Sequence, residues 1–221
     1  QALQVLYALL PKGSPAELRG VFTTLAKYPD PSVTGKTLTV LNNLETPADP
    51  FLEHAIIYTL IQQKNSDELF AALSASDSNN LVRRAALIAL DQIDNADLQA
   101  QHTIPLLSSN NPYLRRTGLW VSSHHPDWAD EVLAHLEREL RAPTFAASGG
   151  TVQVLHAYMN SSKCRELIGD LLNDTESSPD LTRFLLEIVE NTTLERLPDN
   201  WNNGIEQSLE STDSTVRWHA L

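Results

Sequence analysis

Apolar residues recur along this chain at intervals of three and four, the spacing of amphipathic helices, and polar turns separate the apolar segments. At about 100° per residue, one face of a helix near residues 80–93 carries a single apolar stripe. The stripe consists of Val82, Ala85, Ala86, Ala89, Leu90 and Ile93. No segment alternates between apolar and polar residues across hairpin turns, so the pattern predicts an all-α protein.

The helical pattern repeats with a period near thirty residues. Leu52, Val82 and Leu114 hold equivalent positions in similar stretches, at intervals of 30 and 32 residues. Leu181 and Val216 fit the same position, 35 residues apart, and residues 151–159 form a weaker copy. Polar turns that can cap a helix, often with proline, precede the five clear copies at residues 48–50, 77–80, 110–112, 178–180 and 213–214.

Second amphipathic segments lie between the repeated helices, at residues 66–73, 97–107, 128–140, 163–172 and 201–209. A single helix pair cannot bury its own apolar face, whereas stacked pairs bury a continuous core. The sequence therefore predicts a right-handed α-solenoid of antiparallel helix pairs, with about 12–13 helices. We expect one repeat domain over residues 1–221, clearest at 48–141. The part at 1–47 is irregular, with helices near 16–27 and 32–44.

Both ends of the sequence fall inside helical patterns. Residue 1 opens within an apolar pattern that includes Leu3 and Leu6, and residues 215–221 resemble the first turns of a helix. These features predict that the chain is a segment of a longer protein.

Composition and charge narrow the classes of partner. The 221 residues are 42% hydrophobic and 20% charged, as in folded proteins, and no apolar run approaches the length of a membrane span. The formal net charge of −12 disfavours nucleic acids and anionic membranes as partners. We therefore expect a protein partner, no nucleic acid and no membrane insertion. Cys164 is the one cysteine, which excludes an internal disulfide.

Motifs for catalysis are sparse. Gly35-Lys36-Thr37 matches the last three residues of a phosphate-binding loop motif. Asp30, however, occupies the position at which that motif requires its first glycine. Cys164 lies between Lys163 and Arg165, which would lower a thiol pKa, although a buried, inert cysteine is the commoner arrangement. No nucleophile elbow or zincin motif is present. The sequence predicts no enzyme activity and no cofactor.

The densest set of metal-ligating side chains lies at residues 124–135. It contains His124, His125, Asp127, Asp130, Glu131 and His135. Adjacent histidines point about 100° apart on a helix and rarely share an ion. A capped, solvated turn is therefore the preferred interpretation, with a metal site as the alternative.

One short signature resembles the HEAT-repeat family. Asp77 is followed six residues later by Arg83, and Arg115 and Arg217 stand at equivalent positions in later copies. In that family the aspartate and arginine hydrogen-bond between successive repeats, so the resemblance implies an inter-repeat ladder of these four residues. The ladder is interrupted here, because Ser109 replaces one aspartate and Glu53 and Thr182 replace arginines.

A closer resemblance covers residues 50–128, through the strings FLEHAIIYTL, NLVRRAALIALDQI and NNPYLRRTGLWVSSHHPDW. These are similar to the HEAT-repeat region of large exported bacterial proteins that resemble membrane-bound dehydrogenases and often carry a c-type haem domain. The resemblance implies an exported or periplasmic parent protein. The chain has no Cys-x-x-Cys-His, so this segment does not attach haem itself.

A row of basic and aromatic residues recurs two and six positions after each repeat anchor, about 200° and 240° around each helix. In HEAT-like solenoids the second helices line the concave surface. The candidate partner-binding residues are His54, Tyr58, Arg84, Ile88, Arg116, Trp120, Arg183 and Trp218. One interpretation is a binding track of arginine and aromatic residues for a partner. The other is that these residues serve packing between repeats and solubility, with the arginines paired to Glu53 or Asp91.

The sequence thus predicts a non-catalytic docking scaffold, of armadillo-like architecture, for a protein or peptide, including another domain of the parent chain. Two alternatives stay open. One is a HEAT-like enzyme resembling DNA glycosylases or bilin lyases, although a glycosylase needs a basic groove. The other is a structural spacer in a haem- or dehydrogenase-like parent.

Overall fold

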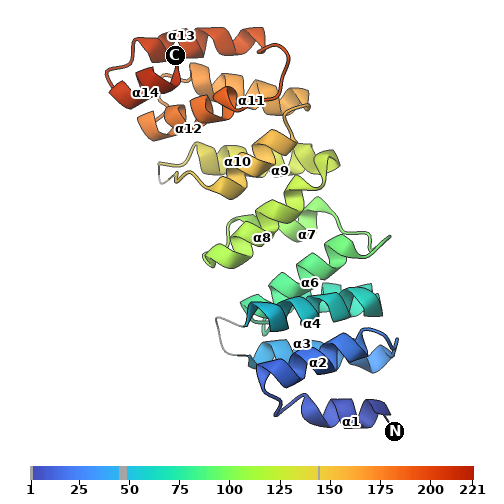
Figure 1. Ribbon diagram of the computed structural model, residues 1–221. Coiled ribbons are helices and arrows are strands. Elements are labelled where there is room, and N and C mark those ends of the chain that lie inside the picture. The colour runs from blue at the N-terminus through green and yellow to red at the C-terminus, as the bar shows by residue number, and fades with distance from the viewer. Residues whose placement is uncertain (1, 45–48, 144) are drawn as a thin grey trace. The chain divides into compact units, whose positions relative to one another are not determined.

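The computed structural model describes residues 2–44, 49–143 and 145–221. Over these residues every regular element is a helix, with fourteen α-helices and two 3₁₀ helices (Figure 1). The all-α prediction is confirmed, and the α-helices number slightly more than expected.

The chain divides into two compact units. Unit 1 comprises Gln1–Leu98 and Leu106–Gly118, and unit 2 comprises Gln99–Pro105 and Leu119–Leu221. The division therefore passes through two helices, α7 (Ala100–Leu107) and α8 (Pro112–Ser123). The predicted single repeat domain stays a prediction.

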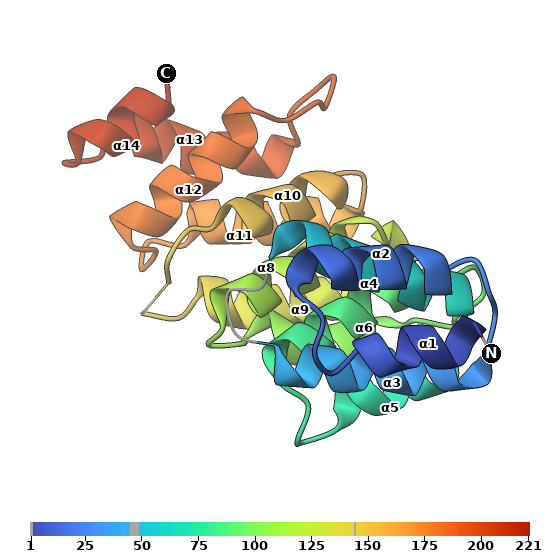
Figure 2. The same cartoon turned by 60° about the horizontal axis from the view of Figure 1, so that its bottom comes forward.

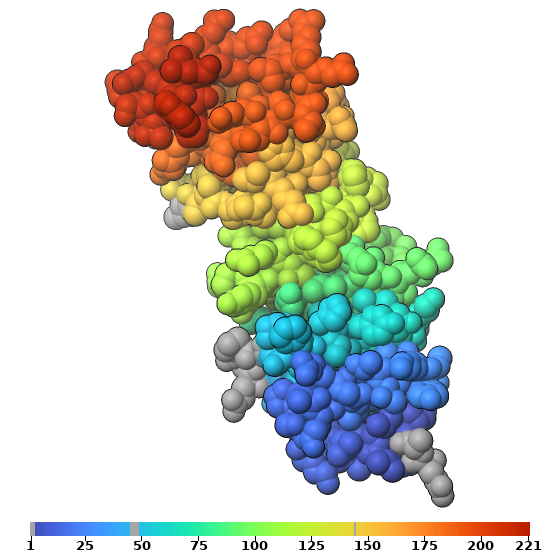
Figure 3. Space-filling view, viewed as in Figure 1, coloured from blue at the N-terminus to red at the C-terminus, as the bar shows by residue number. Residues whose placement is uncertain are grey.

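Unit 1 contains six further helices. They are α1 (Ala2–Leu9), α2 (Pro15–Leu25), α3 (Pro31–Asn43), α4 (Pro50–Gln63), α5 (Ser66–Ser74) and α6 (Asn80–Gln92). Helix α4 packs against α2, α3 and α6, while α5 packs against α3 and α6 (Figure 2). Within this unit, blue to green in Figure 3, helices close in sequence are therefore close in space.

The core of unit 1 follows the predicted periodicity. All six residues of the predicted stripe are buried, five of them on α6 and the sixth, Ile93, directly after it. Leu87 lies outside that stripe and is also fully buried. Because α3, α4 and α5 all contact α6, its buried face is wider than one partner helix would require.

Unit 2 contains the remaining helices. They are η1 (Pro126–Trp128), α9 (Ala129–Leu140), α10 (Gly149–Ala157), α11 (Ser162–Asn173), α12 (Pro179–Glu190), η2 (Asp199–Trp201), α13 (Asn202–Leu209) and α14 (Ser214–His219). Helix α11 contacts α9, α12, α13 and η2, while α12 contacts α10 and α14. Trp201 is fully buried, and its indole Nε1 donates to the Arg165 carbonyl at 2.7 Å.

The predicted capping residues begin their helices as expected. Asp49 accepts hydrogen bonds from two backbone amides of α4, Ser178 accepts from Leu181, and Asn79 accepts from Val82. Asp213 accepts from Val216 and Thr215, and these amides hold the pKa of its carboxyl below the usual value. The helix starts are therefore specified by local chemistry.

No helix in the described ranges is long and apolar enough to cross a membrane.

Gly204 marks a close approach between two helices of unit 2. A Cβ added at Gly204 on α13 would lie 2.7 Å from the backbone of Leu172 on α11. Gly20 on α2 has no atom within 4 Å of the same position. The first glycine is required by packing and the second is not.

We expect Gly204→Ala to lower the free energy of unfolding by about 1–3 kcal/mol, because the backbone of α11 must move. Gly20→Ala is the matched control and should raise it by about 0.5–1 kcal/mol through helix propensity. Urea denaturation followed by circular dichroism measures both. Equal effects at the two positions would contradict the close approach.

Candidate partner-binding surface

Arg84 joins three helices of unit 1. Its Nη1 forms an ion pair with Glu53 on α4, and its Nε donates to the Thr117 hydroxyl on α8 at 3.1 Å. The Thr117 hydroxyl in turn donates to the Tyr113 carbonyl at 2.9 Å. The side chains of Arg84 and Glu53 are only 30% and 16% exposed. For Arg84, the predicted pairing with Glu53 is confirmed, and this arginine holds the helices together.

Three predicted binding residues of unit 1 lie on helices that Arg84 links, α4 and α8. His54, Arg116 and Tyr58 are exposed, Tyr58 to 47%. Across the described part of the chain, none of the three makes a hydrogen bond, ion pair or ring contact. Ile88, on α6, is half-buried. An imidazole, a phenol and a guanidinium are thus free to meet a partner.

The predicted binding residues of unit 2 have different surroundings. Trp120 is half-buried and meets the His124 ring edge-on, with ring centroids 4.3 Å apart. Arg183 pairs with Asp180 one turn away on α12, at 2.9 Å. Trp218 on α14 is 66% exposed. Because α12 and α14 pack together, Arg183 and Trp218 lie on neighbouring helices.

The net charge is distributed unevenly between the units. Unit 1 contains 9 Lys and Arg residues against 11 Asp and Glu, whereas unit 2 contains 7 against 17. Most of the acidity of the chain therefore belongs to unit 2. The total charge, on which the sequence argument relied, conceals a nearly neutral unit that carries the unpaired Arg116.

The residues of the predicted ladder close turns within helix pairs. Arg83 Nη2 donates to the Ala75 carbonyl at the end of α5, at 2.9 Å, and Arg217 Nη1 donates to the Ser211 carbonyl at 2.6 Å. In the described residues Asp77 is exposed and makes no ion pair with Arg83. For Arg83 and Arg217 these bonds stand in place of the predicted contact between successive repeats.

The acceptors are carbonyls at or beyond the C-cap of the preceding helix, in the turn between two helices, where a backbone carbonyl has no partner within a helix. Arg83, Arg115 and Arg217 are each the fourth residue of their helix, from which a long side chain reaches back to the preceding turn. Arg115 is half-buried at this position. Arg165 is also a fourth residue, although the repeat pattern does not predict it, and its Nη1 donates to the Met159 and Asn160 carbonyls at 3.1 and 3.0 Å.

The histidine-rich segment distributes its side chains among separate contacts. His125 stacks on Trp128 with ring centroids 3.8 Å apart. On α9, the Nε2 atom of His135 lies 3.4 Å from the Oε1 atom of Glu139. Across the described ranges, no three or more His, Cys, Asp or Glu residues are placed to hold a metal ion. The Gly35–Thr37 stretch lies inside helix α3, as the sequence argument expected.

Cys164 is buried in unit 2. Its Sγ lies 3.6 Å from the Leu155 carbonyl, and burial raises the pKa of the thiol to about 12, against a smaller lowering by Arg165. A thiol with this pKa is protonated at neutral pH, so the inert interpretation holds for this cysteine.

Comparison with known proteins identifies no family: no protein-family model matches the sequence, and no curated protein matches it. The HEAT resemblance therefore stays a prediction that rests on the repeat and its strings.

We expect the Arg84 and Glu53 side chains to be coupled by about 1 kcal/mol in a double-mutant cycle of Arg84→Met and Glu53→Gln. Chemical denaturation of the four proteins measures the coupling. Asp180→Asn with Arg183→Met is the control cycle, since that pair is more exposed and should couple more weakly. Equal coupling in the two cycles would contradict the bridging role of Arg84.

Alkylation of Cys164 by iodoacetamide at pH 8 should be at least about a hundredfold slower in the folded protein than in urea. Because burial raises the thiol pKa, the folded rate should continue to rise above pH 9, where the unfolded rate levels off. Mass spectrometry follows both rates. A folded rate that levels off near pH 7 would mean an activated thiol.

Proposed function

We propose that this chain is a HEAT-like, right-handed α-solenoid that serves as a non-catalytic docking scaffold for a protein or peptide. The repeat anchors, the caps before each repeated helix and the helix contacts within unit 1 support this arrangement. The observation that carries the function is the face formed by α4, α6 and α8. There Arg84 is fixed and His54, Tyr58 and Arg116 are free.

A fixed framework favours binding at such a face. The Arg84 bonds to Glu53 and Thr117 keep the three helices in register, so the backbone that carries the free side chains needs little reordering when a partner binds. Tyrosine and arginine are also the residue types that most often dominate binding energy at protein interfaces. Tyr58 and Arg116 are therefore the expected anchors of the interface.

Charge indicates the chemistry of the partner. Glu53 is neutralised by Arg84, whereas Arg116 has no acidic partner, so this face favours an extended segment with carboxylates and apolar groups. Nucleic acid is disfavoured, because unit 1, which carries this face, has 11 Asp and Glu residues against 9 Lys and Arg and so lacks the excess positive charge that binds phosphates. A partner subunit or another domain of the parent protein fits this description.

The test is an affinity capture from the source cell, followed by mass spectrometry, with the unmodified chain and a Tyr58→Ala, Arg116→Glu variant as baits. Both side chains are exposed and make no hydrogen bond, ion pair or ring contact among the described residues, so the variant should fold normally. We expect the variant to lose the main partner, with at least about a tenfold reduction in affinity when binding is measured directly.

The matched control is Lys27→Glu with Tyr28→Ala, which makes the same kinds of change at exposed residues after α2, outside the α4, α6 and α8 rows. This control should retain the partner. Equal losses in both variants, or an unchanged partner set with the Tyr58 and Arg116 variant, would contradict the proposed face. Circular dichroism of all baits verifies equal helix content.

A further inference from the structure

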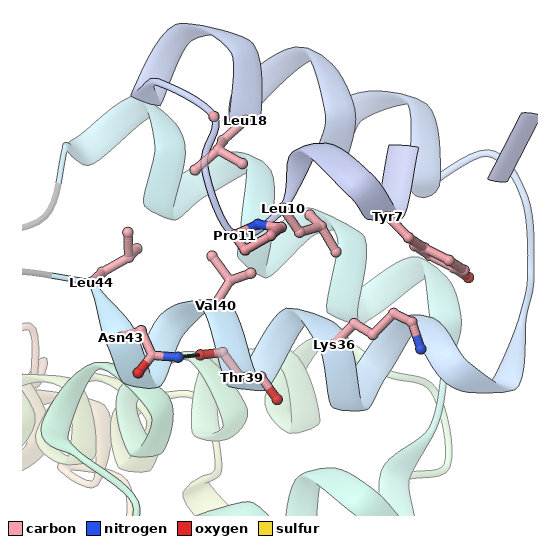
Figure 4. A pocket seen from close by; sticks show the side chains of 10 residues that line it. Tyr7, Leu10, Pro11, Leu18, Lys36, Thr39, Val40, Asn43 and Leu44 are labelled. Carbon is pink, nitrogen blue, oxygen red and sulfur yellow. Dashed lines mark hydrogen bonds between the residues drawn. The ribbon is translucent and has the colours of Figure 1, made fainter. Parts of the chain in front are cut away.

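A pocket of about 490 Å³ opens in unit 1 between the α1–α2 segment and α3 (Figure 4). Its volume is within the range of small-molecule sites. Five apolar residues contribute to its walls: Leu10, Pro11, Leu18, Val40 and Leu44. None of the residues that line it belongs to the α4, α6 and α8 face, so binding in the pocket is independent of the proposed function.

The pocket exists because the face of α3 toward α1 is poorly suited to helix packing. That face carries Lys36, Thr39, Val40 and Asn43, at the i, i+3, i+4 and i+7 spacing of one helix side. Val40 is its one apolar member, and the adjacent face of α3 takes part in the core through Val33 and Leu41. Helix α1 packs mainly on α2 and meets α3 through Tyr7, which leaves space above the rest of α3.

The two ends of the pocket differ in chemistry. Figure 4 shows Leu18 and Leu44 at one end and Tyr7 with Lys36 at the other. The Lys36 ammonium lies 4.8 Å from the centre of the Tyr7 ring, and the Tyr7 hydroxyl is 3.1 Å from the Ser32 hydroxyl. Lys36 is thus held beside the opening, with its charge directed to one end.

Charge then selects the ligand. Lys36 is the one charged side chain among the described residues that line the pocket. The Asp30 carboxylate, outside the lining, interacts electrostatically with Lys36 and accepts hydrogen bonds from Ser32, so it reduces the preference for an anion without contributing to the walls. A bound molecule therefore meets a cation at one end and apolar side chains at the other. An amphipathic anion satisfies both ends, whereas an organic cation would be repelled by Lys36.

We propose that this pocket binds a free medium-chain carboxylic acid. The carboxylate pairs with the Lys36 ammonium, and the alkyl chain lies along Leu10 and Val40 toward Leu18 and Leu44. Lys36 is exposed, so its ion pair adds a modest preference for the anion, while the apolar walls supply most of the affinity.

The test measures binding of decanoate, decanol and decyltrimethylammonium by isothermal titration calorimetry, below the concentrations at which they form micelles. We expect decanoate to bind most tightly. Lys36→Met removes the ammonium and keeps most of the side-chain length, so it should weaken decanoate about threefold and leave decanol unchanged. Lys27→Met, outside the pocket lining, is the control and should change neither.

Two space-filling variants locate the ligand. Val40→Trp and Thr39→Trp should each abolish binding of decanoate and decanol, and thermal unfolding shows whether each variant is folded. Thr39 is exposed, so its variant should fold even where the Val40 variant does not. The pocket is overturned by an absence of decanoate binding, or by binding that persists in a folded filled variant. Anion selection is overturned by equal decanoate affinity in Lys36→Met.

Discussion

The buried face of each central helix in unit 1 is wider than one partner helix can cover, and the rest of that unit is arranged around this constraint. Helix α6 shows it directly, because α3, α4 and α5 all pack against it and Leu87 is as fully buried as the predicted stripe. A helix under this constraint needs neighbours from more than its own pair. Its alanines, such as Ala85 and Ala89, allow those neighbours to approach closely.

Polar side chains form hydrogen bonds with the backbone groups that the helix ends leave without partners. Asp49, Asn79, Ser178 and Asp213 take the free amides at helix starts. Arginines at the fourth helical position take the free carbonyls of the preceding turn. Arg165 does more, because its own carbonyl accepts the Trp201 indole while its guanidinium holds the turn after α10.

The features that depend on neighbouring residues in the sequence could be predicted. The caps and the stripe from Val82 to Ile93 are of this kind, because both follow from spacing along one helix. The burial of Leu87 and the fixing of Arg84 depend on how many other helices arrive at the same place, which periodicity does not encode. Thr117, a residue that sequence analysis did not single out, is the third member of the Arg84 arrangement.

The candidate sites also contain features that the sequence could predict and features that it could not. The positions of His54, Tyr58 and Arg116 on the exposed side of their helices followed from wheel arithmetic. The pocket beside α1 had no signal in the sequence, because it results from a poor fit between two helices. Lys36 even belongs to the stretch Gly35–Thr37, which resembled only the end of a phosphate-binding loop.

The uneven charge of the two units has a consequence for how the chain responds to its solvent. Seventeen carboxylates against seven cations give unit 2 a large self-repulsion, which dissolved ions screen. Unit 1 is nearly balanced and has little repulsion to relieve. Transfer into low salt should therefore lower the stability of unit 2 and leave the stability of unit 1 nearly unchanged. Ionic strength would then affect the two units of this protein differently.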